Sequence, residues 1–193
     1  MSPHAQQKAY DELQSNLAKS ENGKLSEQLL TKSAAPYLHA ILRESHRISP
    51  AFTGVINRDN ATGDIVIHGE RFPKGSAAFF LDSYSVGMDP DIIPDVDTFR
   101  PERWTEKEIL SRKGTPAEVL DHPLYRDPFS AGARKCPGSR VANYEILVML
   151  SQLIKDWKFS IMDDKIKSWR DVECEMALTI MPTVPEFVFD SRN

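Results

Sequence analysis

The sequence has little cysteine and no long apolar run, and these absences exclude several classes of protein. Its two cysteines, Cys136 and Cys174, include no Cys-x-x-Cys pair and cannot form a four-ligand zinc site. No segment reaches the roughly 20 consecutive apolar residues of a membrane helix, and Met1 to Lys8 lack the apolar centre of a signal peptide. With 24 basic residues against 28 acidic ones and no basic block, nucleic-acid binding is not expected.

The composition, 40% hydrophobic and 27% charged over 193 residues, is that of one globular domain with a core of its own. Residues 3–48 are mostly helix formers. They predict a helix from Pro3 to about Lys19, a short helical piece at 25–30, and a helix that begins at Pro36 and stops before Pro50. The sequence therefore predicts a mainly α fold with a small β-sheet.

Residues 52–81 change character and predict that sheet. Val55-Ile56 and the run 65–67 flank residues 60–63, an Asn-Ala-Thr-Gly segment typical of a hairpin turn. A second turn at 72–75 and a short strand at 77–81 follow. We expect a small mixed sheet of three strands here.

Residues 89–128 are rich in proline and charge and lack periodicity, so we expect an ordered coil that serves a function. Residues 139–157 predict a buried helix, because Glu145 is the only charged residue between Arg140 and Lys155. Residues 158–193 predict short C-terminal strands, at 159–161, 178–180 and 187–189.

Cys136 lies in a loop, residues 129–138, whose composition suits a metal-binding thiolate. Gly132 and Gly138 let the backbone turn tightly and approach a flat, bulky group, and Pro137 fixes the chain just after the thiol. The loop leads into the apolar helix, whose partial positive charge at the N-terminus favours a thiolate, and Arg134 acts in the same direction.

Two other interpretations of Cys136 are open from the residues alone. The thiol could be inert and buried in a loop that the glycines merely shape. It could also be a nucleophile paired with a histidine base, although its neighbours do not match those of a cysteine protease. The histidines available for that role are His4, His39, His46, His68 and His122.

The loop resembles the haem-binding loop of the cytochrome P450 superfamily. That loop has the pattern Phe-x-x-Gly-x-Arg-x-Cys-x-Gly. This chain matches it at every fixed position, with Phe129, Gly132, Arg134, Cys136 and Gly138. The helix that follows carries the alanine and the glutamate usual in the family, at Ala142 and Glu145.

Two motifs upstream resemble the same family. Glu44 and Arg47, spaced i, i+3, lie on one face of a predicted helix, and alone they would indicate a surface pair worth under about 1 kcal/mol. In the family this pair is buried and bonds an arginine of a Pro-Glu-Arg-Phe segment. Here that segment is Pro101–Trp104, with Trp in place of Phe. The resemblance implies a network of Glu44, Arg47 and Arg103 that pins coil 89–128 to the core.

The resemblance also implies haem b as the cofactor, with Cys136 as the axial iron ligand and Arg134 as a partner of a haem propionate. Electrons would come ultimately from NADPH through a reductase or a ferredoxin. The basic residues Arg134, Lys135 and Arg140 are candidates for docking this donor, unless they serve only propionate pairing and solubility. A small hydrophobic organic substrate is expected, and loops 49–53 and 177–179 correspond by position to pocket-lining loops.

By resemblance, the chain is expected to be the C-terminal portion of the P450 fold, with the N-terminal half absent and Met1 a truncated or internal start. The missing half holds the oxygen-activating helix, so no catalytic residue is expected here. The implied function is insertion of one oxygen atom from O2 into an organic substrate. The alternatives are a haem-thiolate isomerase or dehydratase that uses no O2, and a non-catalytic haem-binding fragment. The parent would belong to the endoplasmic reticulum membrane or the mitochondrion.

Overall fold

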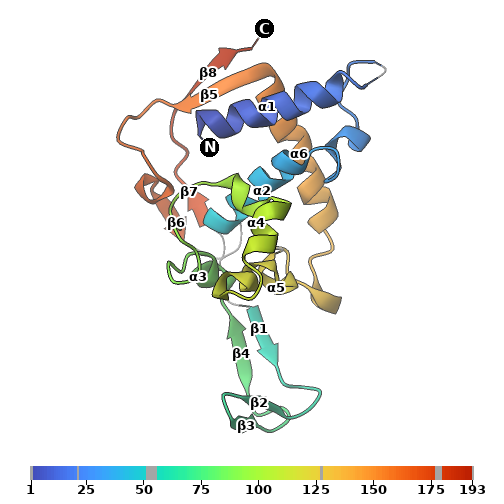
Figure 1. Ribbon diagram of the computed structural model, residues 1–193. Coiled ribbons are helices and arrows are strands. Elements are labelled where there is room, and N and C mark those ends of the chain that lie inside the picture. The colour runs from blue at the N-terminus through green and yellow to red at the C-terminus, as the bar shows by residue number, and fades with distance from the viewer. Residues whose placement is uncertain (1, 21, 51–55, 127, 177–179, 193) are drawn as a thin grey trace.

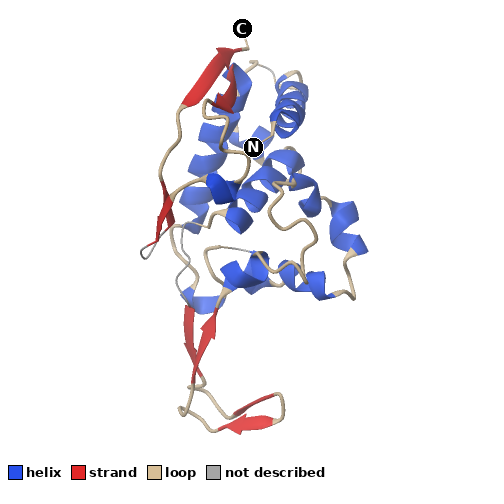
Figure 2. Cartoon of the chain, turned by 90° about the vertical axis from the view of Figure 1, so that its left-hand side faces the viewer, coloured by secondary structure: helices blue, strands red, loops and turns tan. Residues whose placement is uncertain are grey.

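The computed structural model describes residues 2–20, 22–50, 56–126, 128–176 and 180–192. Helices make up the body of the molecule, and a narrow ribbon of strands projects from one end (Figures 1 and 2). The helical elements, with η for short 3-10 helices, are α1 (Pro3–Leu17), η1 (Glu27–Leu30), α2 (Pro36–Ile48), α3 (Ser83–Gly87), η2 (Pro101–Trp104), α4 (Glu106–Ser111), η3 (Pro116–Asp121), α5 (Pro123–Arg126), η4 (Gly132–Arg134), α6 (Ser139–Asp156) and η5 (Trp169–Asp171). The strands are β1 (Ile56–Asp59), β2 (Ile65–Ile67), β3 (Glu70–Phe72), β4 (Ala78–Leu81), β5 (Trp157–Ile161), β6 (Cys174–Met176), β7 (Ile180–Pro182) and β8 (Phe187–Ser191).

The main core lies where α1, α2 and α6 meet. Its buried members include Ala9, Leu13, Leu38, Ile41, Leu42, Leu147 and Ile154. The helix starts follow local chemistry: the Ser2 hydroxyl accepts the Ala5 N–H at the start of α1. At the start of α2, the Glu12 carboxylate accepts the N–H groups of Tyr37 and Leu38 at 2.8 and 2.9 Å. A side chain of α1 thereby caps α2 and complements its dipole.

Helix α6 is buried along one face only, so the expected burial all round is wrong for this chain. Leu147, Ser151 and Ile154 face the core. Val141 and Met149 are 60% and 72% exposed. The apolar pattern requires cover on every side, and the described residues provide it on one side.

Residues 56–81 form a two-part antiparallel ribbon rather than the expected three-stranded sheet (Figure 2). β1 pairs with β4 and β2 pairs with β3, so the hairpin predicted across residues 60–63 is wrong. The tight turn lies instead at His68-Gly69, where φ is 50° and 85°. Positive φ at two successive residues is what a two-residue type I′ hairpin requires. The first residues of the predicted sheet, 52–55, lie outside the described part of the chain.

The buried side chain of Asn60 explains the different pairing. Its amide donates to the carbonyl oxygens of Phe72 and Pro73 and accepts the N–H of Ala77. Asp64 likewise accepts the Lys74 N–H at 2.8 Å. These bonds hold segment 60–64 against the returning chain, so it links the two halves of the ribbon.

Coil 89–128 is ordered through short helices and a second core. The short helices within it are η2, α4, η3 and α5, and the buried residues Ile93, Val96, Trp104 and Leu120 pack with Ala40 of α2.

The C-terminal strands form two antiparallel pairs, β5 with β8 and β6 with β7. Gln6 of α1 binds both backbone groups of Phe159 and so attaches β5 to the helical core. Within the described ranges, the helices are too short or too polar to cross a bilayer.

Candidate functional site

The Cys136 loop places an exposed thiol three residues before α6 begins at Ser139. The loop is closed by the Cys136 N–H, which donates to the Phe129 carbonyl oxygen at 3.0 Å. Ser130 and Gly132 both have positive φ, 69° and 75°, and this turns the backbone tightly ahead of the cysteine. In the described chain the Cys136 thiol is thus exposed and not buried in the core.

The space beside this loop is open. A Cβ added at Gly132 would meet no atom within 4 Å, and one added at Gly138 would lie 3.8 Å from the Cys136 sulfur. A side chain at position 138 would therefore grow beside the thiol. The described residues contain no group of three or more His, Cys, Asp or Glu side chains able to hold a metal. An exposed thiol with open space around it fits a flat metal cofactor that takes one ligand from the protein.

The charged and aromatic side chains at the Cys136 loop are only partly described by the structure. Lys135 and Arg140 are exposed, whereas the side chain of Arg134 lies outside the described residues, so its expected role stays a prediction. Phe129 is half-buried and its ring meets the His46 ring of α2 edge-on, with centroids 6.0 Å apart. This contact links the loop to the helix that carries Glu44 and Arg47.

Glu44 and Arg47 form a buried, bidentate ion pair in α2. Arg47 Nη2 donates to Glu44 Oε1 at 2.7 Å and Arg47 Nε to Oε2 at 3.0 Å. The two side chains are 0% and 3% exposed. The same guanidinium donates to the carbonyl oxygens of Gly87 and Val96 at 3.0 and 2.8 Å. Arg47 therefore ties α2 to the start of coil 89–128.

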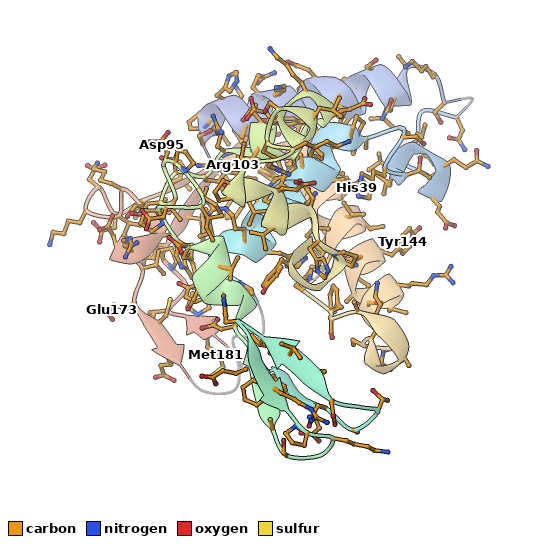
Figure 3. The ribbon with its side chains drawn as sticks, turned by 60° about the horizontal axis from the view of Figure 1, so that its bottom comes forward. His39, Asp95, Arg103, Tyr144, Glu173 and Met181 are labelled. Atoms are coloured by element: carbon orange, nitrogen blue, oxygen red, sulfur yellow. The ribbon has the colours of Figure 1, made fainter. Side chains whose placement is uncertain are left out.

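Arg103 forms a longer ion pair with the same carboxylate. Its Nε lies 3.4 Å from Glu44 Oε1 without a hydrogen bond. Its terminal nitrogens donate to the carbonyl oxygens of Pro94 and Asp95 at 2.8 and 2.6 Å, and Figure 3 shows Arg103 beside Asp95. Burial lowers the pKa of Arg103, and the charge of Glu44 partly opposes this.

Sequence reasoning missed a second polar cluster on the same coil. The Asp121 carboxylate binds Arg43 at 3.0 Å and Arg112 at 2.6 and 2.8 Å. Both guanidinium groups stack on the Trp104 ring, at 3.9 and 4.9 Å from its centroid. Burial raises the pKa of Asp121, but the hydrogen bonds and charges of Arg112 and Arg43 outweigh it and leave the pKa lowered. In the sequence, the one available signal of this cluster was the tryptophan at position 104.

Met88, the residue just before coil 89–128, packs against the second core, and its sulfur lies 3.5 Å from Arg47 Nη1. Its side chain thus contacts the buried arginine directly. Of the two loops expected to line a substrate pocket, residues 51–53 and 177–179 lie outside the described part of the chain.

The family model described as "Cytochrome P450" matches residues 1–185 of this sequence. The chain is 33% identical over 162 residues to the probable cytochrome P450 49a1 of Drosophila melanogaster, covering 82% of this chain and 26% of that protein. It is 30% identical to the cytochrome P450 monooxygenase aunB of Aspergillus niger, covering 83% of this chain and 34% of that protein. A third relative is the mitochondrial sterol 26-hydroxylase of Mus musculus, 32% identical over 65% of this chain and 22% of that protein.

Among solved structures, the retinoic acid bound cyanobacterial CYP120A1 superimposes with a TM-score of 0.72 at 23% identity. The match covers 97% of this chain and 39% of that one. The chain therefore has part of that fold, mainly helical with small antiparallel sheets, as the sequence predicts. It spans 22% to 34% of the length of the curated relatives named above.

Proposed function

Because this chain belongs to the cytochrome P450 family, we propose that it is the haem-thiolate portion of a monooxygenase that inserts one oxygen atom from O2 into an organic substrate. The observation that supports this most directly is the exposed Cys136 thiol in a glycine-containing loop just before α6. One relative, which aligns with 83% of this chain, is named as a cytochrome P450 monooxygenase.

In this proposal the Cys136 thiolate would hold the iron of haem b. Phe129, Gly132 and Gly138 would shape the loop around the thiol, and Arg134 would pair with a propionate. Bound haem would supply the iron at which O2 is activated, with a thiolate ligand that favours O–O cleavage. The protein's part is to present the sulfur on a loop closed by the bond between Cys136 and Phe129.

The network of Glu44, Arg47 and Arg103 is proposed to keep the coil before this loop in place, without touching substrate. An electron-donor protein, supplied ultimately by NADPH, would dock on the face that carries Lys135 and Arg140, which are both exposed. Opposite charge on the donor would steer it to this face.

A second candidate is a non-catalytic, haem-binding fragment. The chain spans 39% of the solved P450 chain that it matches, and apolar side chains on α6 are exposed. Haem retention without turnover would support this candidate over the first.

The ligand assignment is tested by titrating the chain with ferric haem and recording absorption spectra. Cys174 provides a matched control, because it is the other exposed cysteine of the described chain. Cys136→Ala should lose the thiolate spectrum, and Cys174→Ala should keep it. Equal spectra for Cys136→Ala and the parent chain would refute the assignment. A chain that is folded by circular dichroism but binds no haem would refute self-sufficient binding by this portion.

A further inference from the structure

Glu44 is a residue of α2 that binds coil 89–128, and the acceptor sites of its carboxylate are all occupied. Oε1 accepts from Arg47 Nη2 at 2.7 Å and from the Arg100 backbone N–H at 3.0 Å. Oε2 accepts from Arg47 Nε at 3.0 Å and from the Trp104 indole N–H at 2.8 Å. An ionised carboxylate offers about four lone-pair sites, so these four bonds fill them.

Arg103 is not one of these donors. Its Nε lies 3.4 Å from Oε1 without a hydrogen bond, and its terminal nitrogens serve the carbonyl oxygens of Pro94 and Asp95. Arg103 thus contributes charge near Glu44 while its hydrogen bonds order the coil itself. The coil side chain that bonds directly to Glu44 is Trp104.

The indole ring is held in place for this bond. Arg43 and Arg112 stack on it at 3.9 and 4.9 Å from the centroid, and Asp121 holds both guanidinium groups. Arg112 also donates to the Arg103 carbonyl oxygen at 2.7 Å. A phenylalanine at position 104 would keep the stacking and lose the N–H donor, so the hydrogen bond is specific to tryptophan.

We propose that Trp104 is a positioning residue that takes the acceptor site on Glu44 and leaves Arg103 to bind the coil carbonyls. Its importance for haem ligation rests on the proposed function, since the coil leads to the Cys136 loop. In Trp104→Phe one acceptor site on Glu44 becomes vacant. Arg103 Nε lies 3.4 Å from the carboxylate without a hydrogen bond to it, so it is a donor that can take this site.

The test is NMR of the haem-free chain labelled with 15N at the tryptophan indole and arginine Nε positions. The chain has three tryptophans, Trp104, Trp157 and Trp169, and Trp157 is 40% exposed. We expect one indole N–H to exchange with D2O at least about tenfold more slowly than the other two. Trp104→Phe should remove the resonance of this slowly exchanging indole. The same variant should shift the Arg103 Nε–H resonance as that donor moves to Glu44.

Two further variants distinguish this bond from general packing. Glu44→Gln should shift the Trp104 indole resonance, and Arg103→Lys should leave it in place. The proposal is overturned if all three indoles exchange at similar rates, or if Trp104→Phe leaves the protected indole in place. It is also overturned if Arg103→Lys moves the Trp104 resonance as much as Glu44→Gln does. None of these signals needs haem, so a failure of the Cys136 assignment would be seen separately.

Discussion

Replacing Glu44 by Gln removes one charge and part of the acceptor capacity while nearly preserving the side-chain shape. The carboxylate is fully buried, and the paired Arg47 side chain is 3% exposed, so water screens the interaction very little. The amide oxygen of the introduced glutamine could accept about two of the four hydrogen bonds. Its NH2 group would face the N–H donors that now bond to the other carboxylate oxygen. Removing one partner of a buried ion pair typically costs about 3–5 kcal/mol. We expect this loss in the free energy of unfolding, which is about 5–15 kcal/mol for a typical domain.

The assay is urea denaturation at neutral pH followed by far-UV circular dichroism, with the m-value checked for constancy. Glu108→Gln is the matched control, because Glu108 pairs with Arg100 at 3.3 Å and the side chains are 38% and 42% exposed. Its effect should stay below about 1 kcal/mol. If Glu44→Gln falls within about 1 kcal/mol of the parent chain, or equals the control, the buried network does not hold the coil as argued.

Three smaller perturbations test other contacts. The pKa of Asp121 is lowered, because the hydrogen bonds and charges of Arg112 and Arg43 outweigh the effect of burial. The ionised Asp121 therefore contributes stability above about pH 3.9, and this stability is lost as the pH falls through the lowered pKa of the folded state. Asp121→Asn should flatten this acid dependence in urea titrations, and an unchanged slope would contradict the cluster. Glu12→Gln should cost about 0.5–2 kcal/mol through the lost charged cap of α2, measured by thermal unfolding. Asn60→Ala should speed hydrogen exchange in residues 65–77 while the helical core stays protected, which mass spectrometry can resolve.

Local sequence patterns predicted the elements whose causes are local. Ser2 and Pro36 marked helix starts within a residue or two, and the i, i+3 spacing put Glu44 and Arg47 on one face. The burial of that pair was available only through the resemblance to a family, because an isolated Glu-x-x-Arg reads as a surface pair. The fold class came from the same resemblance together with the helical periodicity.

The features that could not be predicted depend on contacts distant in sequence. Asn60 sets the strand pairing of the ribbon through carbonyl groups 12 and 13 residues away, and Asp121 joins Arg43 across 78 residues. The exposed face of α6 depends on what covers the helix, which its own apolar pattern does not specify; Figure 3 shows Tyr144 on the outer side of α6. The replacement of Phe by Trp at position 104 was visible, but its bond to Glu44 required the geometry.

The most direct test of the central claim is the carbon monoxide difference spectrum of the haem-loaded, reduced chain, compared with Cys136→Ala. Cys136 is proposed as the axial ligand, so the parent chain should show the red-shifted Soret band that marks thiolate ligation in this family. The alanine variant should lose that band. A folded, haem-bound parent chain without the band, or a Cys136→Ala variant that keeps it, would contradict the account.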